Sequence, residues 1–219
     1  MITFSKQDFL KNIYKQQEKG EISTSASHLA DVLQVSNAAI SDMSKRLSNE
    51  GLIHYQPYKG LILTEKGEKE ALKVLRRHRL WELFLTKTLD LDWSEVHDEA
   101  ENLEHLSSNF LISKIDAFLD YPKFDPHGSP IPDKEGNLPD MPELISLQKA
   151  QIGETYKVAR VMDNDSKVIR YLGKSGLVLG AIIKVLEKFD YDDTIGIMIG
   201  NKEMIVSDKV GHIIYLEEI

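Results

Sequence analysis

Prolines are distributed unevenly along this chain of 219 residues, and their position limits how it can fold. Six of the seven prolines lie between residues 121 and 142, together with two glycines. Proline lacks a backbone donor and disfavours helix interiors and central strands, so this stretch is expected to form an extended loop. Before it, apolar residues recur mostly at helical spacing; after it, they occur in short β-rich runs. The sequence therefore predicts an α+β multidomain fold that is divided by this loop.

Three short helices are expected in the first fifty residues. The first spans residues 8–17 and ends before Gly20, the second follows a Ser/Thr run at residues 23–27, and the third stops at Gly51. Their buried faces would consist of Phe9, Leu10, Ile13 and Tyr14, then Leu29, Ala30 and Leu33, then Ile40, Met43 and Leu47. Only residues 34–36 separate the second helix from the third, which is the spacing of a helix-turn-helix.

Two short apolar runs, residues 52–55 and 61–64, follow the third helix and are expected to form strands. Residues 56–60 between them contain proline and glycine, which suit the tip of a hairpin. Helices followed by a β-hairpin describe a winged helix, so a DNA-binding domain is expected here. The alternative is a small helical domain with an incidental hairpin and no role in DNA binding.

The outward face of the third helix would enter the major groove. The side chains expected on that face are Asn37, Ala38, Ala39, Ser41, Asp42 and Lys45, and the candidates for phosphate contacts are Arg46 and Lys59. Asp42 can accept a hydrogen bond from cytosine but repels phosphate, so base specificity does not follow from this face. Charge adds weak support, since residues 1–79 carry a net charge of +4 and the remainder carries −12.

Histidines and carboxylates cluster in the middle of the chain. A long helix over residues 65–89, capped by Thr64, places His78 and Glu82 one turn apart. A second helix, capped by Ser94, carries two histidines and two glutamates on one face, namely His97, Glu101, Glu104 and His105. The chain has no cysteine, and imidazole with carboxylate favours a borderline or hard divalent ion. The alternative is that both faces are merely solvated.

A further helix is expected over residues 113–119. The central helices are apolar enough to need a partner surface, most simply a second copy of the chain in a homodimer. Beyond about Leu147 the sequence has five β-rich runs, over residues 155–159, 182–186, 196–199, 202–206 and 213–216. Short strands in such close succession indicate a small barrel.

The winged helix, the segments HRLWE, HDEAENLEH and HGSPIP, and the terminal barrel together resemble one family. It is the diphtheria-toxin-repressor and manganese-transport-regulator family of metal-dependent transcriptional repressors, in its three-domain form. The resemblance implies a winged helix-turn-helix DNA-binding domain at 1–72, a helical metal-binding and dimerisation domain at 73–142, and an SH3-like (iron-transport-accessory-like) domain at 147–219. It also implies a homodimer that binds a palindromic double-stranded DNA operator and controls metal-uptake genes.

The resemblance further implies two metal sites. The primary site would consist of Asp8, Glu101, Glu104 and His105, and the ancillary site of His78, Glu82 and His97. Iron-responsive members place methionine and cysteine where this chain has Asp8 and Glu101, and this replacement of soft sulfur by hard oxygen favours Mn(II), with Fe(II) as the alternative.

Two positions bear on how many ligands are available. Lys11 stands where manganese-sensing members place a second acidic ligand, so the resemblance does not carry over their closely spaced two-metal arrangement. Iron-type members also recruit a ligand from the barrel, and Asp165, followed by Asp163, is the candidate in this chain. His127 in the proline-rich loop receives no assigned role.

Other functional classes are less consistent with the residues. No apolar run approaches the roughly 20 residues of a membrane span, and no signal peptide is evident, so a cytoplasmic protein without a membrane partner is expected. The spacing of His97, Glu101 and Glu104 departs from the zinc-protease and di-iron patterns, so an enzyme is not expected. The alternative from a different class is a winged-helix regulator that responds to an organic ligand or a protein partner.

Overall fold

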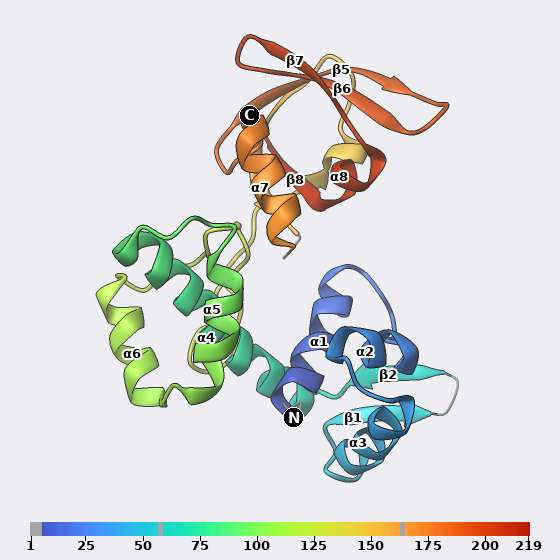
Figure 1. Cartoon of the computed structure of the whole chain (residues 1–219), viewed down its shortest axis with the longest axis vertical. Coiled ribbons are helices and arrows are strands. Elements are labelled where there is room, and N and C mark those ends of the chain that lie inside the picture. Colours follow the sequence, from blue (N-terminus) through green and yellow to red (C-terminus); the bar gives the residue numbers. More distant parts are fainter. Residues whose placement is uncertain (1–5, 57–58, 163–164) are drawn as a thin grey trace. The chain divides into compact units, whose positions relative to one another are not determined.

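The computed structural model describes residues 6–56, 59–162 and 165–219, and the chain forms two compact units (Figure 1). The first unit contains residues up to Arg77 together with Pro132–Leu138, and the second contains His78–Ile131 and Pro139–Ile219. The boundary between them falls inside one long helix, α4 (Glu65–Leu89). Each unit is described on its own below.

The first unit is a winged helix, as the sequence predicts. Its elements are α1 (Lys6–Glu18), α2 (Ala26–Leu33), α3 (Asn37–Asn49), β1 (Ile53–Gln56), β2 (Gly60–Leu63) and the first half of α4. The two strands pair antiparallel, with Ile53 opposite Leu63. Serine hydroxyls cap α2 and α3, where Ser25 accepts from the amide of His28 and Ser36 from that of Ala39. The tip of the hairpin at residues 57–58 lies outside the described residues.

One apolar core holds these elements together. It buries the predicted stripe of α1 with Leu29, Ala30, Ile40 and Leu47, and adds β-hairpin residues and Leu72 and Leu75 from α4. The predicted cap of α4 is confirmed, because the Thr64 hydroxyl accepts a hydrogen bond from the amide of Gly67 at 3.1 Å. The limits predicted for α4 agree with the structure.

The helical part of the second unit comprises the remainder of α4, α5 (Val96–Leu106) and α6 (Asn109–Phe118). Two predictions are wrong in detail. Ser94 does not cap α5, since Glu95 holds the cap position without a side-chain bond, while the Ser94 amide donates to Asp92. The last helix begins four residues before the predicted start, because the Ser108 hydroxyl caps it through the amide of Leu111.

The proline-rich stretch over residues 121–142 contains no helix or strand, as predicted. An isolated bridge between Phe124 and Pro130 closes a compact turn within it. Two arginines of α4 fix the segment that follows, because Arg79 donates to the carbonyl of Pro130 and Arg76 donates to that of Pro132. These two bonds satisfy loop carbonyls from α4, so the loop has a defined course.

The rest of the second unit is a small, strongly bent antiparallel sheet (Figure 1). Its strand order is β3-β8-β4-β5-β6-β7. The bounds are β3 (Ile145–Ser146), β4 (Thr155–Val161), β5 (Ile182–Phe189), β6 (Thr194–Ile199), β7 (Lys202–Val206) and β8 (Ile214–Glu218). All five predicted strands are present, and the two-residue β3 is additional. Alternate strand residues such as Val158, Ile183 and Ile197 fill one apolar core.

Two helices of this region are absent from the sequence prediction, α7 (Ser166–Ser175) and α8 (Asp208–Ile213). Both are short and interrupt β-rich sequence, although the apolar residues Val168, Ile169 and Leu172 of α7 recur at helical spacing. Asp165 at the start of α7 and Gly176 at its end, with φ of +82°, are the capping signals that could have revealed it. Among the described residues, no helix is long and apolar enough to cross a membrane.

Candidate metal centre

His78 and Glu82 lie one turn apart on α4, with both side chains buried. The Nε2 atom of His78 lies 3.0 Å from Oε1 of Glu82. Spacing i to i+4 places the two side chains on one helical face, as the sequence predicts. The pair forms one wall of a polar cluster inside the second unit.

α5 supplies the opposite wall. Nδ1 of His97 lies 3.0 Å from Nε2 of His78 and 3.2 Å from Oε1 of Glu82. The second nitrogen of His78, Nδ1, lies 2.7 Å from Oε2 of the fully buried Glu104 and 3.4 Å from Oε2 of Glu101. His78 therefore contacts ligands of both predicted sites, and the two sets are adjacent.

The electrostatics of the cluster require positive charge. Burial by itself raises the pKa of the Glu82 carboxyl, but the charge of His78 and hydrogen bonds from His78 and His97 hold that pKa well below its ordinary value. Glu104 brings a second buried carboxylate to the same ring. Buried carboxylates are stable only when paired with a cation or a metal ion.

The donor atoms fit a divalent cation. Nε2 of His78, Oε1 of Glu82 and Nδ1 of His97 lie 3.0 to 3.2 Å from one another. Neighbouring ligands of an octahedral ion with bonds of about 2.1 Å are about 3.0 Å apart. The residues that the sequence assigns to the ancillary site are thus close enough together to share one ion.

The residues assigned to the primary site divide between the two units. Glu101, Glu104 and His105 lie on α5 in the second unit, and Nε2 of His105 lies 3.2 Å from Oε1 of Glu104. Asp8 lies in the first turn of α1, in the first unit. Lys11, one turn further along α1, has a buried side chain. Asp8 and the α5 residues of the predicted primary site therefore belong to different units.

The structure adds two residues that the sequence reasoning did not assign. Asp125 and His127 of the proline-rich loop are buried beside Glu82, and His127 Nδ1 lies 4.0 Å from Glu82 Oε2. Burial raises the pKa of the Asp125 carboxyl, and the charge of Glu82 acts in the same direction, against His127 and Arg79. The sequence signal that could have identified these two residues is a carboxylate two positions before a histidine within a rigid Pro/Gly-rich loop.

The loop holds His127 in one orientation. Its Nε2 donates to the carbonyl of Trp93 at 3.0 Å, and its ring stacks on the Trp93 indole at a centroid distance of 5.5 Å. The other ring nitrogen, Nδ1, is thereby directed toward Glu82. Asp125 Oδ1 in turn accepts from the amides of His127 and Ser129, both at 2.8 Å. This is the arrangement of an oriented ligand with supporting contacts.

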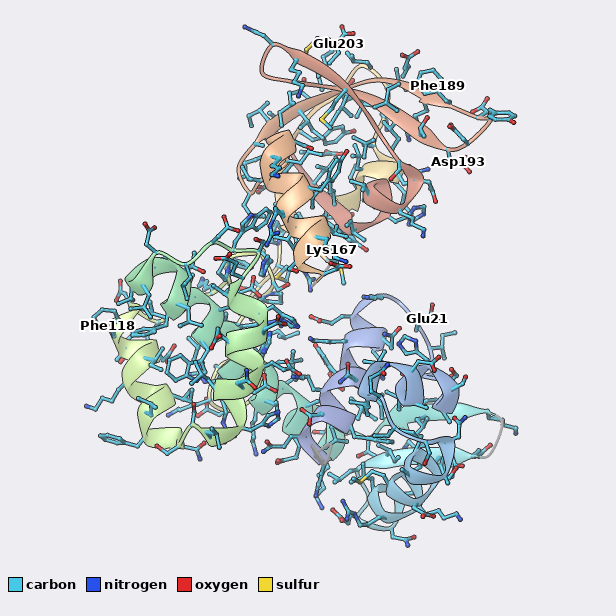
Figure 2. All side chains as sticks on the ribbon, in the orientation of Figure 1. Glu21, Phe118, Lys167, Phe189, Asp193 and Glu203 are labelled. Atoms are coloured by element: carbon cyan, nitrogen blue, oxygen red, sulfur yellow. The ribbon has the colours of Figure 1, made fainter. Side chains whose placement is uncertain are left out.

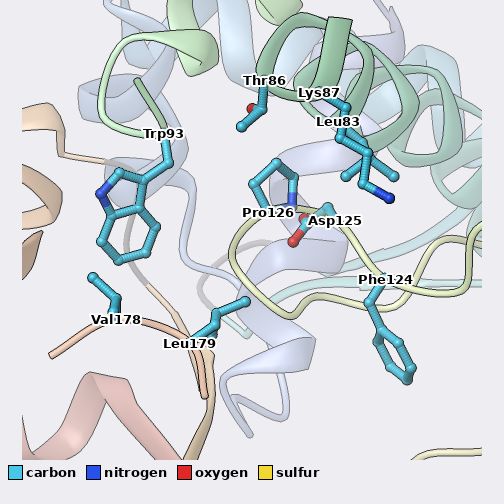
Figure 3. A pocket seen from close by; sticks show the side chains of 9 residues that line it. All are labelled: Leu83, Thr86, Lys87, Trp93, Phe124, Asp125, Pro126, Val178 and Leu179. Atoms are coloured by element: carbon cyan, nitrogen blue, oxygen red, sulfur yellow. The ribbon is translucent and has the colours of Figure 1, made fainter. Parts of the chain in front are cut away.

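The barrel supports the same loop. The amide of Val161 on β4 donates to the carbonyl of His127 at 2.9 Å. Gly128 has φ of +80°, and a Cβ there would lie 2.1 Å from the carbonyl oxygen of Ala159, at a bulge in β4. A groove beside this contact is lined by Leu83, Thr86, Lys87, Trp93, Phe124, Asp125, Pro126, Val178 and Leu179 (Figure 3).

The two barrel candidates are not part of these clusters. Asp165 caps α7, where its Oδ1 accepts from the amide of Lys167 at 2.8 Å, and it belongs to none of the grouped ligand sets found among the described residues. Asp163 lies outside the described residues.

The residues predicted to face DNA lie on or near the surface of the first unit. Asn37, Ala38, Asp42, Lys45 and Arg46 of α3 and Lys59 of the hairpin are exposed, and Ala39 and Ser41 are half-buried. Arg46 is turned back along α3, where its guanidinium contacts Met43 and approaches Glu50. The opposite face of α3 supplies Ile40 and Leu47 to the core.

Comparison with known proteins agrees with this organisation. Residues 1–61 match the model of the iron-dependent repressor N-terminal DNA-binding domain, residues 64–133 that of the metal-binding and dimerisation domain, and residues 145–218 that of the FeoA domain. The diphtheria toxin repressor of Corynebacterium glutamicum is 31% identical over 189 residues, which cover 82% of each chain. This chain belongs to the iron-dependent repressor family. The repressor IdeR of Mycobacterium leprae is 28% identical over 222 residues, 96% of each chain.

Solved structures similar to this repressor include manganese-responsive proteins. A manganese-dependent transcriptional repressor solved with manganese is 35% identical, with a TM-score of 0.91 over 97% of this chain and 99% of that one. The manganese regulator SloR is 32% identical, with a TM-score of 0.85 over the whole of both chains. The predicted family, fold class and function as a metal-dependent transcriptional repressor are confirmed, including its DNA-binding and dimerisation domains.

Proposed function

We propose that this repressor responds to Mn(II), binds a palindromic operator as a homodimer in the cytoplasm, and controls metal-uptake genes. The observation that carries the proposal is the cluster of His78, Glu82 and His97, whose donor atoms are oxygen and imidazole nitrogen without sulfur. Such a donor set favours Mn(II) over softer ions. Relatives whose names specify manganese support the choice, and Fe(II) is the alternative that iron-dependent relatives support.

The primary site of the proposal joins the two units. Asp8 is the ligand from the DNA-binding unit, and Glu101, Glu104 and His105 are the ligands from α5. A bound divalent cation would neutralise these carboxylates and stabilise the arrangement in which Asp8 and α5 come together. Without it, Asp8 and the α5 carboxylates repel one another, so the orientation of the DNA-binding unit is less restricted.

A third set of ligands is available at Glu82, Asp125 and His127. His127 presents Nδ1 to Glu82, while the backbone amides of the loop orient Asp125. Glu82 belongs to both this set and the His78–His97 set, so one ion can draw on either group. We propose that His78, Glu82 and His97 hold the ancillary ion and that Asp125 and His127 are additional ligands beside Glu82. Asp165 and Asp163 are further candidates.

Two surfaces complete the proposal. The exposed residues of α3 and Lys59 contact DNA, with Lys45, Arg46 and Lys59 positioned for phosphate. α6 and the end of α5 supply the dimer face, because Leu106, Phe110 and Phe118 are more than half exposed. Phe118 is labelled on α6 in Figure 2. Large apolar side chains that are exposed in a single chain favour burial against a second copy.

Anaerobic calorimetric titration with Mn(II), Fe(II) and Zn(II) tests the metal assignment. Mn(II) is expected to bind wild type tightly enough for the site to be occupied at the cellular concentration of Mn(II). The Asp8→Ala variant is expected to bind less Mn(II) than wild type. A repressor that responds to an organic ligand would bind no Mn(II) above the level of a carboxylate surface. Fe(II) binds most oxygen and nitrogen sites more tightly than Mn(II), so the iron-responsive alternative would be supported by stronger DNA affinity with Fe(II) than with Mn(II).

A further inference from the structure

A hydrogen bond joins α4 to the corner between α5 and α6. The indole Nε1 of Trp81 lies 2.7 Å from the hydroxyl of Ser107, and this hydroxyl lies 2.6 Å from the carbonyl of Leu103. Both side chains are buried. Ser107 is the residue at which α5 ends, and Ser108 then caps α6.

The direction of the two bonds is fixed by chemistry. An indole nitrogen can only donate, and a backbone carbonyl can only accept. The Ser107 hydroxyl must therefore accept from Trp81 and donate its single proton to Leu103. A side chain without a hydroxyl at position 107 would leave the buried indole N–H unpaired and lose both bonds.

These bonds bear on the metal ligands through the end of α5. The last four carbonyls of a helix have no partner within the helix, so its final turn frays unless other groups satisfy them. Glu104 and His105 lie in that final turn, and Ser107 satisfies the carbonyl of Leu103 beside them. Trp81 stands next to the ligand Glu82 on α4 and also packs edge-on against Phe84.

We propose that Trp81 and Ser107 are positioning residues for the metal centre. Their hydrogen bond holds the final turn of α5 against α4, and this sets Glu104 at 2.7 Å from His78 before any ion binds. A preorganised ligand set loses less conformational entropy on binding, so breaking this bond weakens metal binding even though neither residue is a ligand. The inference rests on the proposed metal-dependent function.

The test compares five variants of the full-length repressor. Ser107→Ala removes both bonds, Trp81→Phe removes the indole donor and keeps an aromatic ring, and the double variant removes both partners. Ser107→Thr keeps the hydroxyl. Ser113→Ala is the matched control, because the Ser113 hydroxyl makes the same type of bond to the carbonyl four residues earlier, on the exposed face of α6.

Mn(II) affinity is measured by anaerobic calorimetry, and the melting temperature is measured without metal. Ser107→Ala and Trp81→Phe are each expected to weaken Mn(II) binding by about threefold to tenfold, the size expected from loss of the Trp81–Ser107 hydrogen bond that both variants lack. The double variant is expected to bind Mn(II) with the same affinity as the single variant that binds it less tightly. Both substitutions break the same Trp81–Ser107 contact, so their effects do not add. Ser107→Thr should bind within about twofold of wild type, as should Ser113→Ala.

The outcomes separate this inference from the proposed function. If wild type binds no Mn(II) or Fe(II), the proposed function fails. If wild type binds metal and Ser107→Ala binds it equally well, with only a lower melting temperature, Trp81 and Ser107 are structural and the inference is wrong. Additive losses in the double variant, or failure of threonine to restore affinity, would also overturn it.

Discussion

Nδ1 of His78 on α4 lies 2.7 Å from Oε2 of Glu104 on α5, while Nε2 of the same ring lies 3.0 Å from Glu82. One imidazole thus connects two buried carboxylates that the sequence assigns to different metal sites. Because His78 contacts both ligand sets, a change at one set alters the surroundings of the other.

Replacement of Glu104 by glutamine should separate metal binding from folding. Glutamine has nearly the same shape but no charge, so the metal-free protein should melt at or above the wild-type temperature. Mn(II) at about 100 times its dissociation constant should stabilise wild type by about 2.7 kcal/mol, or roughly 5–10 °C, and this rise should be largely lost in the variant. Differential scanning fluorimetry with and without Mn(II) measures both effects.

The control is Glu203→Gln on the exposed strand β7 (Figure 2), which should leave the Mn(II)-induced rise unchanged. A full rise in Glu104→Gln would show that Glu104 is not a ligand.

The loop residues should change the amount of metal bound. Asp125→Asn keeps the oxygen that accepts from the amides of His127 and Ser129, but it removes the charge beside Glu82. Asp125→Asn and His127→Ala are each expected to lower the number of Mn(II) ions that the protein retains in equilibrium dialysis. His212→Ala, on the exposed α8, is the control. Unchanged metal content in both loop variants would limit the centre to residues of α4 and α5 in the second unit.

Gly128→Ala tests whether the loop is fixed against the barrel. Gly128 and Gly153 both have φ near +90°, so alanine costs about 1 kcal/mol in backbone strain at either position. Only at Gly128 would the new Cβ meet a backbone oxygen, at 2.1 Å, whereas nothing lies within 4 Å at Gly153. Gly128→Ala should therefore lower stability by about 1–3 kcal/mol more than Gly153→Ala in urea unfolding. Equal losses of stability in the two variants would mean that the loop moves away from strand β4 without a cost in free energy.

DNA contacts can be tested through salt dependence. Lys45→Ala on α3 should weaken binding to all sequences alike and reduce the slope of log affinity against log salt by about 2 per dimer, one for each subunit. Lys209→Ala on α8 is the control, because this exposed lysine belongs to the second unit. An unchanged slope in Lys45→Ala would remove this residue from the DNA surface.

Much of the helical structure followed from local signals. The limits of α4 were predictable because Thr64 caps it, apolar residues recur with helical period, and Asp90, with φ of +56°, interrupts it. The pairing of His78 with Glu82 followed from the same spacing. Local signals also explain the errors, since serine is a good capping residue at either position, yet Ser108 caps α6 whereas Ser94 does not cap α5.

The remaining features depend on contacts between distant segments. Asp125 and His127 reach Glu82 because amides of their own loop, Trp93 and strand β4 fix the turn. No periodicity encodes such a loop conformation. α7, in contrast, had local signals in its apolar spacing and in its caps Asp165 and Gly176, and it was missed because the runs on both sides of it are β-rich.

The most direct test of the account is the linkage between metal and DNA. A palindromic duplex selected from random DNA in the presence of Mn(II) is titrated with the repressor at fixed salt, in Mn(II) and in excess chelator, with fluorescence anisotropy as the readout. A coupling of about 1–3 kcal/mol per metal site predicts at least a tenfold increase in affinity with Mn(II), and loss of that increase in Asp8→Ala. Equal affinity in Mn(II) and chelator would contradict the account.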